Sequence, residues 1–158
     1  LKGTIDKGLI LDPCNDLTID CYPDADFAGL WGYDDPQDPH CVCSWTGYVI
    51  TLCGCPVLWA SKLQTEIALS TAEAEYIALS SSLREVIPLM TVMDELNEVF
   101  PLLMEVPQFY CKVWEDNQSC IAMATSRNIS PSSIITSRGT SNWDEFRLIT
   151  LNASRQTF

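Results

Sequence analysis

The feature that most constrains this chain is an amphipathic stretch that begins at Ser70. Ser70-Thr-Ala-Glu73 has the form of a capping box, in which the Ser70 hydroxyl and the Glu73 carboxylate each accept from a free backbone amide at a helix start. Apolar residues then recur every three or four positions, the spacing of one helix face. They are Tyr76, Leu79, Leu83, Val86, Ile87 and Met90. The pattern predicts a helix packed on a core. Pro88 predicts a kink, or a break with a second helix over about residues 89–100.

Strand-like runs lie on both sides of this helix. Strands are predicted over residues 17–22, 46–52, 57–62 and 109–115, and a short helix over residues 118–125. The first run alternates apolar and polar side chains, which is the period of a half-buried strand. Pro23 lacks a backbone donor and predicts a bulge there. Residues 53–56 predict a turn between the second and third strands.

The length and charge of the chain limit what it can be. Its 158 residues are enough for one domain with a single core. No apolar run approaches about 18 residues and no signal peptide is present, which predicts a soluble protein that is not secreted. The missing initial Met predicts a fragment of a longer protein. With 9 basic and 21 acidic residues the net charge is −12, which argues against tight nucleic-acid binding by this chain alone.

Eight cysteines raise two alternatives to plain packing. A disulfide framework is disfavoured, because the chain is not short and carries no export signal. Cys41-x-Cys43 and Cys53-x-Cys55 could form a four-thiolate zinc site. Paired zinc ligands usually have about two to four residues between them rather than one, so small buried residues are the more ordinary interpretation.

Three carboxylates fall where separate elements end or begin. Asp24 follows the first strand, Glu75 lies one turn into the helix, and Asp116 follows the strand at 109–115. Carboxylates that converge from separate elements repel one another, so such a cluster needs a cation, and Mg²⁺ suits hard oxygen ligands. Two ions about 4 Å apart could bind the attacking and leaving oxygens of a phosphodiester. The alternative is scattered surface acids in an acidic chain.

Several short motifs occur in an order that resembles one family. The motifs are Tyr22-Pro-Asp-Ala-Asp-Phe-Ala-Gly29, Ser44-Trp-Thr-Gly-Tyr48, Trp59-Ala-Ser-Lys62 with Gln64, Ala68-Leu-Ser-Thr-Ala-Glu-Ala-Glu-Tyr-Ile-Ala-Leu79 and Glu115-Asp-Asn-Gln-Ser119. Together they resemble the ribonuclease H domain of copia-type LTR retrotransposon Pol polyproteins, which follows the reverse transcriptase. The match covers about residues 1–131, and the block around Glu75 with Asp116-Asn117-Gln118 is highly specific in combination.

The resemblance implies an α/β, three-layer fold, with a mixed sheet of about five strands flanked by helices. It makes residues 1–16 a linker from the reverse transcriptase and 17–131 the ribonuclease H-like domain, and it leaves 132–158 as an atypical tail that is either disordered or frameshifted. The implied activity is hydrolysis of the RNA strand of RNA–DNA hybrids during reverse transcription, with the hybrid read by shape and 2′-OH groups. The implied partners are that hybrid and the adjoining reverse transcriptase, with no membrane. The implied location is the cytoplasm, in a virus-like particle, or the nucleus.

The resemblance also implies roles for individual residues. Carried over by motif, the catalytic and metal-binding residues are Asp24, Glu75 and Asp116, with Asn117 and Gln118 as substrate-binding residues. The implied cofactor is a pair of Mg²⁺ ions, for which Mn²⁺ can substitute. One ion lowers the pKa of the attacking water and the other stabilises the departing 3′ oxygen. Asp26 and Glu73 are expected instead to shape the loop and the helix cap.

The tail departs from the family pattern after Pro131. Residues 126–158 carry a net charge of +2 where residues 1–125 carry −14, and 11 of these last 33 residues are Ser or Thr. The Thr-Lys-His-hydrophobic-Asp segment of the family is missing, so the position of its fourth acid falls near Ser137, and no His follows His40. We therefore expect a loosely held second ion and reduced turnover. A shifted reading frame would explain the change, and predicts that another frame of the encoding nucleotides restores the Lys-His motif.

Three functions follow from these observations. The leading prediction is a ribonuclease H module of a retrotransposon polyprotein, impaired by loss of the fourth acid. The second is a catalytically inactive remnant that packs against the reverse transcriptase. The third is a thiol-rich, zinc-binding interaction module.

Overall fold

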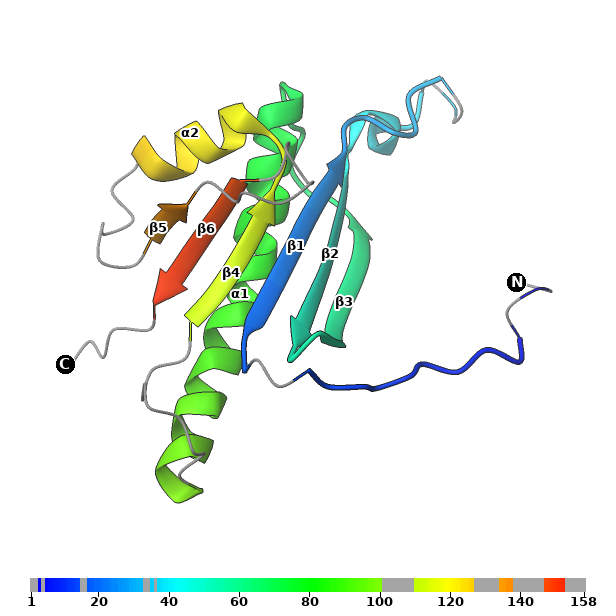
Figure 1. The fold of residues 1–158 in the computed structure, drawn as a ribbon. Helices are drawn as coiled ribbons and strands as arrows, with labels where there is room; N and C mark the ends of the chain where they lie inside the picture. Colours follow the sequence, from blue (N-terminus) through cyan, green and yellow to red (C-terminus); the bar gives the residue numbers. More distant parts are fainter. Residues whose placement is uncertain are drawn as a thin grey trace.

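The computed structural model forms one sheet with two helices packed on it (Figure 1). It describes residues 3, 5–14, 17–32, 35, 37–100, 110–126, 134–137 and 147–152. The strands are β1 (Ile19–Asp26), β2 (Trp45–Leu52), β3 (Cys55–Leu63), β4 (Tyr110–Glu115), β5 (Ile134–Ser137) and β6 (Arg147–Asn152). The helices are α1 (Thr71–Val99) and α2 (Gln118–Ser126), with a 3-10 turn, η1, over Pro39–Val42. The predicted α/β class, with a mixed sheet, is confirmed.

The sheet is mixed, with the strand order β3-β2-β1-β4-β6-β5. β1 pairs antiparallel with β2 along its full length and parallel with β4 over Ile19–Cys21. Helix α1 forms the crossover between β3 and β4 (Figure 1). Because β1 and β4 run in the same direction, their carboxyl ends reach the same edge of the sheet.

The turn between β2 and β3 consists of two residues with positive φ. Cys53 has φ 53° and Gly54 has φ 79°. Such a pair of left-handed residues is what a tight two-residue hairpin requires, because its twist matches that of the flanking strands. The turn predicted at residues 53–56 is therefore confirmed, and Cys55 already belongs to β3.

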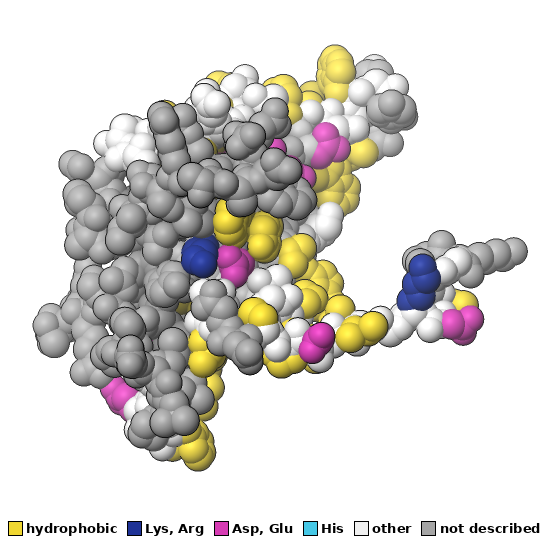
Figure 2. Space-filling view, in the orientation of Figure 1, with side chains coloured by type: hydrophobic (Ala, Val, Ile, Leu, Met, Phe, Trp, Pro, Cys, Tyr) yellow, Lys and Arg dark blue, Asp and Glu magenta, His cyan; other side chains and the backbone are white. Residues whose placement is uncertain are grey.

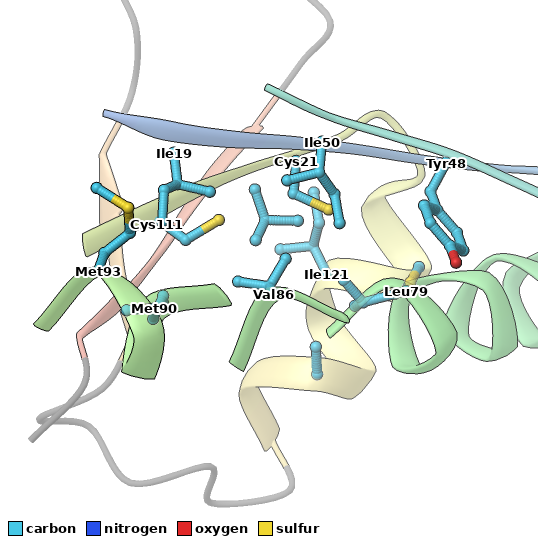
Figure 3. Close-up of a cluster of buried hydrophobic side chains, with 13 residues drawn as sticks. Ile19, Cys21, Tyr48, Ile50, Leu79, Val86, Met90, Met93, Cys111 and Ile121 are labelled. Carbon is cyan, nitrogen blue, oxygen red and sulfur yellow. The ribbon is translucent and has the colours of Figure 1, made fainter. Parts of the chain in front are cut away.

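The core lies between the sheet and the two helices (Figure 3). Its buried side chains are Ile19, Cys21, Tyr48, Ile50, Leu79, Val86, Met90, Met93, Cys111, Val113, Cys120, Ile121 and Ala124. The predicted apolar face of α1 is largely confirmed, with Tyr76 and Leu83 packed at its margin. Ile87 was expected on this face, but it is 59% exposed, because Val86 beside it takes the inward position.

The start of α1 agrees with the predicted capping box. The Ser70 hydroxyl accepts from the Glu73 N–H at 3.2 Å. The Glu73 carboxylate accepts from the N–H of Leu69 at 2.8 Å, one residue before the cap. The expected break at Pro88 is wrong, since α1 continues through this residue to Val99. Core residues on both sides of Pro88 bury the same helix face, which offsets the lost backbone hydrogen bond.

The bulge expected at Pro23 is also absent. Pairing of β1 with β2 runs through Pro23, opposite Tyr48, without a register shift. The pairing with β4 ends at Cys21, so at Pro23 β1 is paired only with β2. The backbone N–H that proline lacks is therefore not needed on the β4 side, as at a sheet edge. The irregularity lies instead between β2 and β3, at Ile50 and Thr51.

In the described residues both helices lie on one face of the sheet, so this part of the chain forms two layers where the resemblance implies three. Exposed apolar side chains lie on the other face, including Tyr22, Val49 and Trp59. Figure 2 is drawn from the side of that face and shows apolar side chains gathered on the described part of the surface.

Two segments of the expected tail take part in the sheet. β6 pairs antiparallel with β4, and β5 pairs antiparallel with β6. Ser137, near which the fourth acid of the family would fall, is the last residue of β5. The remaining residues of the tail lie outside the described part of the chain.

The positions of the cysteines argue against both cysteine alternatives. None of the eight forms a disulfide. Cys41 and Cys43 precede β2, whereas Cys53 and Cys55 follow it, so the eight-residue strand separates the two pairs by roughly 25 Å. The four thiols cannot share one zinc ion, and the third predicted function loses its basis. Cys21, Cys111 and Cys120 are fully buried in the core.

Among the described residues, no helix has the combination of length and apolar character that crossing a membrane would require.

Candidate functional site

Asp24, Glu75 and Asp116 lie near enough to one another, at one edge of the sheet, for their charges to interact. Asp24 stands near the carboxyl end of β1, and Asp116 directly follows β4. Glu75 lies in the second turn of α1 and is 8% exposed, whereas the two aspartates are exposed. The negative charges of Asp24 and Asp116 both act on Glu75 and raise its pKa. Three residues far apart in the sequence are therefore electrostatic neighbours.

Burial and charge act together on Glu75. Loss of hydration, followed by the charges of Glu115, Asp24 and Asp116, raises the pKa of Glu75 to about 8. The backbone N–H of Ala25 donates to the carboxylate and partly opposes this rise. Oε2 of Glu75 is buried and has no hydrogen-bond partner within the described structure. Glu75 is thus a buried carboxylate that is hydrogen-bonded to the backbone near the end of β1, and its Oε2 has no hydrogen-bond donor among the described residues.

The structure adds a fourth carboxylate, Glu115, which the sequence indicated only as the end of a strand. Glu115 is fully buried. Its Oε1 accepts from the Asn117 N–H at 3.0 Å and the Cys120 thiol also donates to it, while Oε2 has no partner among the described residues. Burial is the largest cause that raises the pKa of Glu115, to about 7, and the two hydrogen bonds oppose it.

Strand alternation explains the orientation of Glu115. Cys111 and Val113 are buried against the helices, so Glu115 is the next residue on that face. Asp116 lies beyond the strand and is exposed. Continuing the alternation from the apolar residues of this strand would have predicted the inward carboxylate. We refer to Asp24, Glu75, Glu115 and Asp116 as the acidic cluster.

Asn117 and Gln118, the expected substrate-binding residues, lie at the start of α2. The Asn117 side-chain oxygen accepts from the Cys120 N–H at 2.9 Å, which makes Asn117 the N-cap of this helix. Its backbone carbonyl accepts from the Ile121 N–H at 3.0 Å. Gln118 is the first residue of α2 and is exposed. Asn117 therefore has a structural role as the cap of α2, and its backbone N–H also holds the Glu115 carboxylate.

Two neighbouring acids have roles in local structure. Glu73 caps α1, as described above. The Asp26 carboxylate folds back onto the turn after β1, where a Cβ added to Gly29 would overlap it. Both positions agree with the expectation that Asp26 shapes the loop and Glu73 the helix cap.

The donor chemistry of the acidic cluster suits a hard divalent cation. Carboxylate oxygens are the ligands that Mg²⁺ prefers, and two buried ones, on Glu75 and Glu115, lack partners in the described structure. Over the described ranges, no three acidic, His or Cys side chains are arranged to hold a metal ion as they stand. Their raised pKa values mean that Glu75, and in part Glu115, keeps its proton at neutral pH. Cation binding would therefore require loss of protons and adjustment of these side chains.

Comparison with curated proteins finds similarity to retrovirus-related Pol polyproteins of plant transposons. The chain is 34% identical over 111 residues to the retrovirus-related Pol polyprotein from transposon RE2 of Arabidopsis thaliana, which covers 70% of this chain and 7% of that protein. It is 37% identical over 124 residues to the corresponding polyprotein from transposon TNT 1-94 of Nicotiana tabacum, which covers 78% of this chain and 8% of that protein.

A further similarity involves a shorter protein. The chain is 36% identical over 87 residues to secreted RxLR effector protein 161 of Plasmopara viticola, covering 55% of this chain and 56% of that protein. No family model and no solved structure matches the chain. The chain spans only 7–8% of the length of the two Pol polyproteins. These findings support an origin of this chain as a segment of a retrovirus-related Pol polyprotein.

Proposed function

We propose that this chain is the ribonuclease H module of a retrotransposon Pol polyprotein and hydrolyses the RNA strand of RNA–DNA hybrids at the acidic cluster. The observation that supports the proposal is that Asp24 of β1 and Asp116 at the end of β4 both act by their charge on Glu75 of α1, whose pKa is raised mainly by burial and further by Glu115 and these two aspartates. The similarity to Pol polyproteins is independent support.

In this proposal Asp24, Glu75 and Asp116 hold two Mg²⁺ ions, or Mn²⁺ in their place. When bound, the ions supply an activated water and charge stabilisation for the departing 3′ oxygen. The chain's own residues orient the ligands. Ala25 holds Glu75 through its backbone N–H, and Cys120 and Asn117 hold Glu115. Glu75 must release its proton before it can act as an anionic ligand, because its pKa is raised to about 8.

The proposed substrate requires a partner that supplies positive charge. A chain with a net charge of −12 repels the phosphate backbone, so a basic surface must come from elsewhere. We assign this role to the adjoining reverse transcriptase of the same polyprotein, in a cytoplasmic virus-like particle. The hybrid would be recognised by its shape and its 2′-OH groups rather than by base sequence.

The activity is proposed to be low, because the fourth acid of the family has no counterpart at its expected place. Ser137 stands near that position and has no carboxylate. Glu115 is a further carboxylate of the cluster, but it stands at the end of β4 and not at the position of that fourth acid. A weakly held second ion would reduce turnover even where the first ion binds.

Cleavage of a labelled RNA–DNA hybrid in Mg²⁺ or Mn²⁺ tests the proposal. The chain should cut the RNA strand, and both Asp24→Asn and Asp116→Asn should reduce cutting to background. Asp26→Asn, on the same strand but outside the acidic cluster, should retain it. Equal cutting by the chain and by Asp24→Asn would contradict the proposal.

The missing acid favours one further candidate, a catalytically inactive remnant that packs against the reverse transcriptase. This candidate predicts no cleavage and binding of at most one divalent ion. Calorimetric titration with Mg²⁺ separates the two, since the active module binds two ions.

A further inference from the structure

We infer that Gln64 is a positioning residue for Glu75, an inference that rests on the proposed function of the acidic cluster. Gln64 directly follows β3 and is 5% exposed. Its side-chain Nε2 donates to the carbonyl of Ala74 at 3.0 Å. Ala74 immediately precedes Glu75, so the Gln64 side chain is bonded to the backbone of the helical turn that carries the proposed ligand.

The same Nε2 also connects Gln64 to the sheet. It donates to the Thr46 hydroxyl, on β2, at 3.0 Å. Thr46 stands opposite Ala25 in the pairing of β2 with β1. Ala25 in turn donates its N–H to the Glu75 carboxylate. The contacts therefore form a closed ring through β1, β2 and α1, in which Gln64 is one of two links between the helix and the sheet and the Ala25–Glu75 bond is the other.

The backbone of Gln64 is itself fixed. Its N–H donates to the carbonyl of Ser44 at 2.8 Å. The Ser44 hydroxyl is fully buried and accepts from the N–H of Ala28, in the turn after β1, at 3.2 Å. A side chain that starts from an anchored backbone and ends in two hydrogen bonds has little freedom, and this is the property a positioning residue needs.

The hydrogen bonds of Gln64 explain why an amide is needed here. Both partners of Nε2 act as acceptors, so the orientation of the amide is determined, and its Oε1 is left buried without a partner among the described residues. Leaving a buried oxygen unpaired is unfavourable, so the two donated bonds are what this side chain contributes. A glutamate at this position could not donate either bond when ionised, and a methionine would fill the same space without a donor.

Two variants and two readouts test the inference. Gln64→Met removes the donor of both side-chain hydrogen bonds, and Thr46→Val removes the hydroxyl that accepts one of them. Thr46→Ser keeps that hydroxyl. The first readout is the amide resonance of Ala25, which reports on its bond to Glu75 without any metal. The second is Mg²⁺ affinity by calorimetry at pH 8.5, where Glu75 is deprotonated. Gln64→Met should shift the Ala25 resonance and weaken Mg²⁺ binding about 10–100-fold, the usual effect of losing a residue that orients a metal ligand.

Met93→Ala is the matched control for stability. Met93 is buried in the core near the far end of α1, so its truncation should lower the thermal midpoint while leaving the Ala25 resonance and Mg²⁺ affinity unchanged. Thr46→Ser should behave like the parent chain. Thr46 stands opposite Ala25, so Gln64→Met is the decisive variant, and an unchanged Ala25 resonance in it overturns the inference. If the parent chain binds no Mg²⁺ the proposed function fails, and the Ala25 resonance alone then decides the role of Gln64.

Discussion

The indole N–H of Trp114 donates a 2.8 Å hydrogen bond to Oδ1 of Asp20, which joins β4 to β1 on the sheet face opposite the helices. The Trp114 ring also stacks on Tyr22, with 6.1 Å between ring centroids and 6° between planes. The second oxygen of Asp20 accepts from the Thr18 hydroxyl at 3.0 Å. Side chains therefore reinforce a parallel pairing that spans only Ile19–Cys21 on β1.

Replacing Trp114 by Phe should lower the free energy of unfolding by about 1–2 kcal/mol, because a hydrogen bond to a charged carboxylate is lost while the stacking on Tyr22 is retained. Urea denaturation measures the change. Asp20→Asn keeps an acceptor for the indole and should cost less than Trp114→Phe. Equal stability of Trp114→Phe and the parent chain would show that the bond contributes nothing.

Stability should fall as the pH rises from about 5 to about 8. Glu75 and Glu115 have an ordinary pKa of 4.5, and folding raises their pKa values to about 8 and about 7. Between these limits the folded chain binds more protons than the unfolded chain, so the free energy of unfolding decreases with rising pH. Below pH 4.5 both states are protonated and the effect disappears. Thermal melts without divalent ions should give a higher midpoint at pH 5 than at pH 8.5.

The double variant Glu75→Gln with Glu115→Gln is the control for this pH dependence. Neither amide ionises, so the midpoint should change much less between pH 5 and pH 8.5. A variant that keeps the full slope of the parent chain would assign the effect to other groups.

Mg²⁺ should raise the thermal midpoint at pH 8.5, and EDTA should reverse the rise. A ligand that binds only the folded state stabilises it by about 2.7 kcal/mol at 100 times its Kd. The effect should be smaller at pH 6, where protons on Glu75 and Glu115 compete with the ion. Glu75→Gln should remove the response, whereas Glu73→Gln, two residues away in the helix cap, should preserve it. A response that survives in Glu75→Gln would place the ion elsewhere.

Pro88→Ala should raise the free energy of unfolding by about 1–3 kcal/mol. Pro88 is exposed in the interior of α1, and alanine would restore a backbone donor to the carbonyl four residues earlier. Chemical denaturation measures the gain. Glu85→Ala, an exposed change in the same helix, should alter stability by less than about 0.5 kcal/mol. A loss of stability in Pro88→Ala would mean that Pro88 stabilises the helix at this position.

Local patterns were sufficient to predict the elements that position the site. The capping box at Ser70, the alternation in β1 and the turn at Gly54 each depend on neighbouring residues, and each has the predicted structure. Asp24, Glu75 and Asp116 could be selected from their places at strand and helix ends. Their mutual approach depends on the parallel pairing of β1 with β4, which no local pattern encodes.

The features that the sequence did not predict depend on packing at long range. Pro88 fails to break α1 because the same core continues on both sides of it, and Pro23 causes no bulge because β1 lacks a second partner there. The pairing of β6 with β4 involves a segment without apolar periodicity. The strand pattern does not single out Glu115 as a buried residue, because burying a carboxylate is costly and a Glu at a strand end is usually exposed.

The reactivity of the three fully buried thiols reports how often the core of this chain opens to solvent. Burial raises the pKa of Cys21 to about 11, and the pKa values of Cys111 and Cys120 also lie far above the ordinary value. The thiolate is the nucleophile that attacks alkylating reagents, and these residues do not form it while they stay packed. The rate at which iodoacetamide modifies them therefore measures how often β1, β4 and α2 separate. Equal rates at all three would mean that they separate in a single cooperative event.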